Sequence, residues 1–240
     1  MELSLGELVA AMAAALAGGL VQGSVGFGLN LVAVPVVALV APDALPTALI
    51  LLALPMTVLM ARRERHALDR RGFVWITMGR LPGTVLGAWI VAVVSGDALL
   101  GLVGAVVVVA VVMSMTSPPV AVTRPTALIA GLASGVMGTA TAIGGPPLAL
   151  LYQHRDGPTL RSTLASAFLV GIAMSLTALA LAGEVDRDQV GLALALAPAM
   201  LAGLWASRLT TRWLDARWLR PAVLGFAAVT GVVAILRAVA

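Results

Sequence analysis

The chain has 240 residues, of which 60% are hydrophobic and 11% charged, and its mean hydropathy is +1.05. Soluble domains carry roughly a quarter of their residues as charges, so this composition excludes an ordinary water-soluble protein and predicts a polytopic helical membrane protein. The net charge is +4 and all 15 basic residues are Arg, but they gather at the ends of apolar segments, as orientation signals do. We therefore expect no nucleic-acid partner. The absence of Cys excludes disulfides and thiolate chemistry.

Eight apolar segments follow one another, separated by short polar connections. They cover residues 4–41, 44–61, 73–94, 98–115, 125–153, 158–183, 189–209 and 217–238. No connection is long enough to form a soluble domain, so we predict a single membrane domain over residues 1–240 surrounded by membrane lipid.

The first and fifth segments are longer than the roughly 20 residues that a crossing helix needs, and each contains a cluster of helix-breaking residues. The first cluster contains Gly26, Gly28, Asn30 and Pro35, and the second is the run 144–147, Gly-Gly-Pro-Pro. In a helix interior each Gly costs about 1 kcal/mol and each Pro about 3 kcal/mol. Both segments are therefore predicted to break in the middle.

Glycines, prolines and a tryptophan recur at fixed offsets in the second half of the chain. An offset of 112 relates Gly19, Gly23, Gly26 and Pro35 to Gly131, Gly135, Gly138 and Pro147, and an offset of 116 relates Pro82, Gly87 and Trp89 to Pro198, Gly203 and Trp205. Paired prolines and tryptophans in the same order predict a duplicated unit of four segments, residues 1–116 and 120–240.

The distribution of Arg predicts how the two halves are oriented. The 62–71 connection carries five Arg and the 208–220 stretch carries four, and such runs face the cytoplasm. If all eight segments crossed, the two stretches would lie on opposite faces. Both face the cytoplasm if segments one and five enter and leave on the same side, as broken re-entrant helical hairpins. The predicted fold is therefore an all-α integral membrane protein, an inverted repeat of two four-segment halves with six full crossings.

Two hairpins entering from opposite sides would bring both breaks to the middle of the bilayer. Irregular backbone is tolerated there only in packed protein or beside a polar cavity, and the N-terminus of each returning helix attracts anions. Inverted repeats with discontinuous helices are typical of secondary transporters. We expect a small anionic substrate to bind in and beside the breaks, at Gln22, Gly26, Phe27, Gly28, Asn30, Arg80, Gly138, Thr139, Thr141, Gly144 and Gly145.

Two of these features have a structural alternative. Gly19 with Gly23, and Gly131 with Gly135, have the four-residue spacing of close helix packing as well as that of a site. Arg80 lies about 10 Å along its segment by helix rise. Its side chain could bind the substrate or extend to the cytoplasmic surface, and the sequence leaves both open.

The glycine and proline motifs also resemble those of a known family. The motifs are Gly19-x-x-x-Gly23-x-x-Gly26-x-Gly28 with Pro35, Gly131-x-x-x-Gly135-x-x-Gly138 with the run 144–147, Pro82-Gly83-x-x-x-Gly87, and Arg161-Ser-Thr-x-Ala-Ser. The chain resembles, over essentially its whole length, the TauE/SafE family of sulfite and organosulfonate exporters. Unlike many relatives, it has Leu29 and Asn30 where a further glycine is common. The resemblance implies export of a small sulfur-containing oxyanion across the bacterial inner membrane.

The residues that are missing limit the mechanism. No Asp or Glu lies in the middle of a segment, and His66 and His154 both lie in connections. We therefore expect no catalytic acid–base pair, no metal site and no cofactor, and we predict a transporter rather than an enzyme. An integral-membrane enzyme and a structural membrane subunit are the alternatives. The sequence does not determine the exact substrate, the direction of transport, the coupling ion or the oligomeric state.

Overall fold

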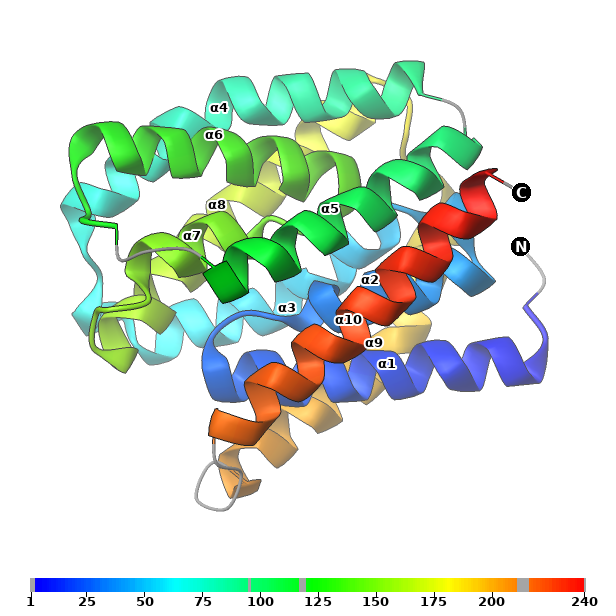
Figure 1. The fold of residues 1–240 in the computed structure, drawn as a ribbon, viewed down its shortest axis with the longest axis horizontal. Coiled ribbons are helices and arrows are strands. Elements are labelled where there is room, and N and C mark those ends of the chain that lie inside the picture. The colour runs from blue at the N-terminus through cyan, green and yellow to red at the C-terminus, as the bar shows by residue number, and fades with distance from the viewer. Residues whose placement is uncertain (1–2, 95, 117–119, 211–215, 240) are drawn as a thin grey trace.

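The computed structural model describes residues 3–94, 96–116, 120–210 and 216–239, and within these ranges the regular structure is entirely helical. The first half contains α1 (Leu5–Val25), α2 (Leu29–Val40), α3 (Thr47–Arg63), α4 (Arg70–Val93) and α5 (Gly96–Thr116). The second half repeats the order with α6 (Arg124–Thr141), α7 (Gly145–Tyr152), α8 (Gly157–Leu181), α9 (Arg187–Thr210) and α10 (Ala216–Val239). Short 3-10 helices at Pro42–Ala44 and Arg65–Ala67 lie in two of the connections. Figure 1 shows one bundle of helices.

Side-chain caps explain where several helices begin. The first turns of four helices are capped by Ser4, Asp69, Thr123 and Asp156, each of which accepts a hydrogen bond from the backbone N–H of the third residue of its helix. These caps satisfy N–H groups that have no partner inside the helix.

Both long segments break, as the sequence predicts. α1 ends at Gly26 (φ +101°), and α2 starts after Gly28 (φ +121°), so two glycines make the turn. α6 ends at Ala142, which has a left-handed backbone (φ +62°) that is unfavourable for a residue with a Cβ atom. The second break therefore falls at residues 142–144, at the start of and just before the helix-breaking run 144–147.

Hydrogen bonds and one ion pair gather several connections at one end of the bundle, here called the basic end. Arg161 pairs with Glu64 at 2.9 Å, and the Tyr152 hydroxyl donates to Asp69 at 2.8 Å. This end therefore includes the 64–69 and 153–156 connections and the starts of α4 and α8. The Arg-rich part of 62–71 lies here. In the second Arg-rich stretch, 208–220, residues 211–215 lie outside the described residues.

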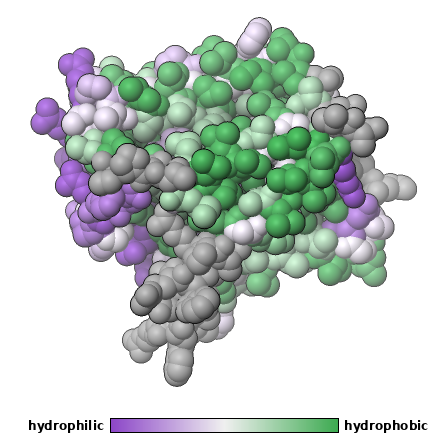
Figure 2. Space-filling view, viewed as in Figure 1, coloured by the Kyte–Doolittle hydropathy of each residue, from purple (hydrophilic) through white to green (hydrophobic). Residues whose placement is uncertain are grey.

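The opposite end, here called the acidic end, joins the 41–46 and 182–186 connections. The Thr47 hydroxyl donates to the Glu184 carbonyl at 2.9 Å, and the Gln189 amide donates to the Asp43 carbonyl at 3.2 Å. Figure 2 shows hydrophobic residues across the middle of the visible face and hydrophilic residues at its two ends. An apolar belt between two polar ends is the surface expected of a protein that crosses a membrane.

Each broken segment forms a hairpin with one long and one short arm. α1 starts at the acidic end, is about 30 Å long by helix rise, and is followed by α2, which returns about 18 Å. α6 starts at the basic end, is about 27 Å long, and is followed by α7, which returns about 12 Å. At the tip of the first hairpin Gly26 packs against the Arg161 side chain, which pairs with Glu64 at the basic end.

Five helices of the described residues are long and apolar enough to cross a membrane. They are Leu5–Val25, Arg70–Val93, Ala98–Met115, Gly157–Leu181 and Arg187–Arg208. This set supports an integral membrane protein, but it differs from the six predicted crossings. It includes α1, and it leaves out α3, which has 17 residues, and the shorter apolar stretch Leu224–Ala238 of α10.

Glycines bring two pairs of helices into close contact, α1 with α9 and α4 with α6. A Cβ atom added to Gly19 would collide with the Met200 carbonyl oxygen, and one added to Gly131 would collide with the Ile76 carbonyl oxygen. The packing interpretation of these glycines, which the sequence left open, is the one that the structure supports.

We predict that Gly131→Ala lowers the thermal stability of the purified protein, because the added methyl group meets the α4 backbone, whereas Gly191→Ala does not. Overpacking costs about 1–3 kcal/mol, and Gly191, also in a helix, has no atom near an added Cβ. Melting curves in detergent measure the difference. Equal melting temperatures for the two variants would contradict close packing of α4 on α6.

Candidate functional site

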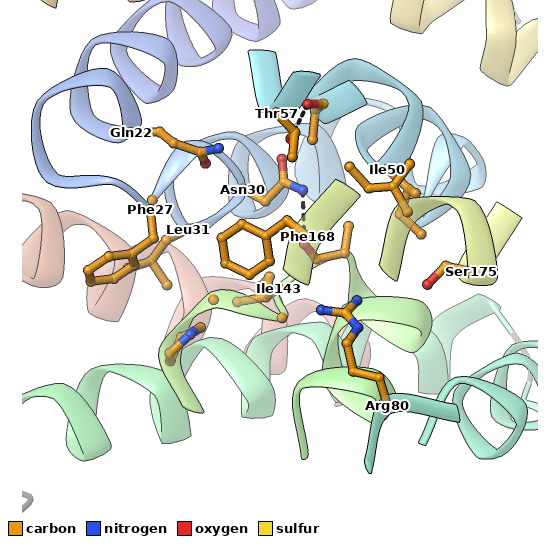
Figure 3. Close-up of a pocket in the computed structure, with 18 residues that line it drawn as sticks. Gln22, Phe27, Asn30, Leu31, Ile50, Thr57, Arg80, Ile143, Phe168 and Ser175 are labelled. Atoms are coloured by element: carbon orange, nitrogen blue, oxygen red, sulfur yellow. Dashed lines mark hydrogen bonds between the residues drawn. The ribbon is translucent and has the colours of Figure 1, made fainter. Parts of the chain in front are cut away.

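A cavity of about 60 Å³ lies between the two breaks, and residues from both breaks line it (Figure 3). Gly28 and Asn30 come from the first break, and Gly144 and Gly145 come from the second. α3, α4 and α8 complete the wall. This volume has room for several water molecules or for one small polyatomic ion.

Arg80 of α4 carries the positive charge of this cavity. Its side chain is only 4% exposed, and its Nη1 donates a hydrogen bond to the Ser134 hydroxyl at 2.9 Å. The Ser134 hydroxyl in turn donates to the Gly144 carbonyl at 2.6 Å, in the second break. The sequence left open whether the Arg80 side chain extends to the surface. In the structure this side chain points into the bundle.

The Arg80 guanidinium fits because two glycines leave space for it. An added Cβ on Gly171 of α8 would collide with the guanidinium, and one on Gly138 would lie 3.2 Å from Nη2. The Nε atom is buried without a hydrogen-bond partner, and no carboxylate of the described residues forms an ion pair with Arg80. A buried charge without an ionic partner is costly, so this arrangement favours an anion beside it.

Asn30 links the two breaks through hydrogen bonds of its side chain. Its Nδ2 donates to the Ala142 carbonyl at 2.8 Å and to the Leu49 carbonyl at 3.3 Å. Because both partners are acceptors, the amide nitrogen must face them, which fixes the orientation of the amide. The Oδ1 atom is then a buried acceptor without a donor.

The helix N-termini at the breaks offer fewer free N–H groups than the sequence interpretation assumed. The Leu29 N–H, at the start of α2, already donates to Gln22 Oε1 at 3.0 Å. At the start of α7, Pro146 and Pro147 have no N–H at all. The helix tips therefore offer fewer free N–H groups than expected, whereas Arg80 supplies a full positive charge at the same cavity.

The structure places eight of the eleven predicted site residues around the cavity. They are Gln22, Phe27, Gly28, Asn30, Arg80, Gly138, Gly144 and Gly145. The other three lie outside it. Gly26 packs against Arg161, the Thr139 hydroxyl is bonded to that of Ser175 at 2.7 Å, and the Thr141 hydroxyl donates to its own helix at Met137. Whether the eight residues bind a substrate stays a prediction.

Several residues at the cavity were not predicted from the sequence. Thr57 of α3 and Phe168 and Ser175 of α8 line it, and Ser134 and Gly171 hold Arg80. Ser134 lies four residues before Gly138, so helical spacing could have placed it on the same face. No such signal marks the residues of α3 and α8, because only the tertiary packing brings them to the breaks.

The short helix α7, which follows the second break, is held at the basic end by Asp69. The Tyr152 hydroxyl and the Gly72 N–H each donate to the Asp69 carboxylate, and the Asp69 N–H donates to the Thr163 hydroxyl. Partial burial alone would raise the pKa of Asp69. The hydrogen bonds from Gly72 and Tyr152, together with the nearby Arg155 charge, nevertheless hold this pKa below its ordinary value.

Taken together, an apolar helical bundle, membrane-length helices and a cavity lined by a buried cation fit the class of polytopic membrane transport proteins. Within the described residues no group of three His, Asp or Glu side chains is placed to hold a metal ion.

The family model described as sulfite exporter TauE/SafE matches residues 11–234. The chain therefore belongs to the TauE/SafE family, as the resemblance of its motifs implied. Comparisons with curated proteins and with solved structures gave no match.

We predict that the stability of the protein falls at acidic pH in part through Asp69. Because the folded-state pKa of Asp69 is lowered, its contribution is fully present above the ordinary pKa of an aspartate and is lost as the pH falls below that value toward the folded-state pKa. Melting temperatures of the wild type and Asp69→Asn between pH 3 and pH 7 provide the measurement, with a flatter pH profile expected for the variant. Parallel profiles would show that Asp69 has no such role.

Proposed function

We propose that this protein is a secondary transporter that exports a small sulfur-containing oxyanion, such as sulfite or a sulfonate, across the bacterial inner membrane. The anion binds beside Arg80, between the two breaks. The observation that carries the proposal is the buried Arg80 guanidinium, which lines the cavity between the breaks and pairs with no carboxylate of the described residues.

The chemistry of the cavity suits an oxyanion. A guanidinium forms short, charge-assisted hydrogen bonds with oxyanions, and these are stronger away from water. The free Oδ1 of Asn30 is an acceptor for a protonated oxyanion or for a polar group of an organic sulfonate. Phe27 and Phe168 provide apolar walls that limit water around the anion. No Asp, Glu or His of the described residues lines the cavity, which argues against acid–base catalysis there.

The architecture supports alternating access by two inverted halves. α1 packs on α9 while its counterpart α6 packs on α4, so each half contributes its hairpin to the other half. α3 contacts α8, and α5 contacts α10, which are the corresponding helices of the two halves. Rocking of one half against the other would then open the cavity first to one side and then to the other.

The orientation follows from charge. With the basic end in the cytoplasm, the hairpin α1–α2 enters from outside and α6–α7 enters from the cytoplasm, both as re-entrant elements. An anion that leaves a cell with a negative interior gains roughly 2.3 kcal/mol per charge per 100 mV, so export needs no dedicated coupling group.

We predict that Arg80→Gln lowers sulfite binding and flux in proteoliposomes by roughly 10- to 100-fold, because a hydrogen bond to a charged group contributes about 1.5–3 kcal/mol. Arg80→Lys keeps the charge but loses the forked geometry, so an intermediate loss is expected. The matched control is Arg62→Gln, which removes an exposed Arg at the basic end. Sulfite-induced shifts of the melting temperature report binding separately from flux. Wild-type binding and flux by a folded Arg80→Gln protein would refute the proposed site.

The hairpin topology can be tested with single cysteines, because the chain has none of its own. We predict that Ala121→Cys and His154→Cys, on either side of α6–α7, react with a membrane-impermeant thiol reagent from the cytoplasmic side. Ser4→Cys and Asp43→Cys, on either side of α1–α2, should react from the outside. All four positions are exposed. If the two members of either pair reacted from opposite sides, that segment would cross the membrane and the re-entrant model would fail.

A further inference from the structure

A second cavity, separate from the Arg80 site, lies at the basic end. It has a volume of about 410 Å³ and shares no lining residue with the cavity between the breaks. The first turn of α4, the segment 122–124 and the 153–156 connection form its wall. The transport mechanism proposed above assigns no role to it.

The charge of this cavity is predominantly positive. Arg71, Arg124 and Arg155 line it together with a single carboxylate, that of Asp69. Both oxygens of that carboxylate already accept hydrogen bonds, one from the Gly72 N–H and the other from the Tyr152 hydroxyl. The three guanidinium groups therefore leave an excess of positive charge and of hydrogen-bond donors, a combination that favours a phosphate group.

One of the three arginines is held in place by an aromatic ring. The Cζ atom of Arg124 lies 4.0 Å from the centre of the Trp75 ring. Stacking on a ring face positions the guanidinium while its N–H edges stay free to donate. Trp is also the residue that favours the headgroup level of a bilayer, which places this cavity at the membrane surface.

An apolar groove is lined by residues directly before and after the same segment. Val120 and Thr126 flank the segment 122–124 and line this groove of about 200 Å³. From Thr126 to Ala133 it follows α6 for about 10 Å by helix rise, away from the basic end. Leu150 of α7 forms part of the opposite wall, and the one hydroxyl in the groove, that of Thr126, is already bonded to the Ala121 carbonyl at 2.7 Å.

We propose that these two features form one binding site for an anionic phospholipid. The phosphate lies in the cavity against Arg71, Arg124 and Arg155, and an acyl chain follows the groove along α6. A free phosphate ion would use only the cavity and would leave the groove empty, whereas a lipid matches both the charge and the apolar path. Basic pockets between helices on the cytoplasmic side of a membrane are typical of such lipid sites.

The site lies beside α7, so a lipid bound there would affect the stability of this helix. The groove contacts α7 at Pro147 and Leu150, and the cavity includes Asp69, which holds the end of α7. A lipid bound to the folded state alone stabilises that state by mass action. We therefore expect anionic phospholipid to stabilise the hairpin α6–α7.

Native mass spectrometry and melting curves of the detergent-purified chain test this proposal, with phosphatidylglycerol and phosphatidylcholine of identical acyl chains as probes. The wild type should bind phosphatidylglycerol about tenfold or more tightly than phosphatidylcholine. Arg71→Gln combined with Arg155→Gln should remove that preference. The matched control, Arg62→Gln combined with Arg65→Gln, removes the same charge from exposed positions of the basic end that do not line the cavity.

A second variant tests the groove. Ala133→Phe fills it and should weaken phosphatidylglycerol binding while the protein still folds, as the melting curve without lipid will show. Equal loss of lipid preference in the control pair would overturn the proposal, because the effect would then be one of general charge. If inorganic phosphate stabilised the protein as much as phosphatidylglycerol and Ala133→Phe changed nothing, the site would bind free phosphate and not a lipid. None of these readouts depends on transport, so they are independent of the proposed function.

Discussion

The constraint on which this structure depends is the hydrogen bonding of the backbone where helices break inside an apolar bundle. An unpaired N–H or carbonyl away from water is costly, so a helix break is stable only if other groups form hydrogen bonds with the freed backbone groups. Three side chains do so here. Gln22 accepts from the Leu29 N–H, Asn30 donates to the Ala142 carbonyl, and Ser134 donates to the Gly144 carbonyl. Two of these three side chains, Gln22 and Asn30, also line the cavity, so the groups that stabilise the breaks also shape the site.

The Asn30 hydrogen bond has a particular role because it joins the two halves of the chain. It links the first turn of α2 with the end of α6, and thus one hairpin with the other. A glycine at this position has no side-chain amide and could not form this bond. Arg80 extends the network through Ser134 to the same break. The cavity is therefore framed by contacts between the hairpins rather than within either of them.

The sequence was sufficient to predict the class of protein and the existence of both breaks. Apolar length and the clustering of Gly and Pro are local signals, and Gly26, Gly28 and the run 144–147 lie at or next to the observed turns. The point at which the first helix ends was harder to predict. α1 runs on to Gly26 without a break despite Gly18, Gly19 and Gly23, because these glycines pack against α9 and α2 and the helix continues through them.

The composition of the site was predictable only in part. Residues within the breaks could be named because they stand beside the helix-breaking residues in sequence. The direction of the Arg80 side chain depends on space left by Gly171, which is 91 positions further along the chain, and no local pattern connects the two. The sequence already showed that Pro146 and Pro147 have no N–H groups. Only the structure showed that Arg80 lies at the same cavity and supplies positive charge there.

Arg80 has no acidic partner among the described residues, and this has an electrical consequence for the proposed transport cycle. The vacant site carries one positive charge, and a bound monovalent anion cancels it. The loaded form then moves through the bilayer as a nearly electroneutral unit, while the vacant form carries its charge back. The membrane voltage would thus act mainly on the return of the empty carrier, and the protein would set the voltage sensitivity of the cycle through a single guanidinium.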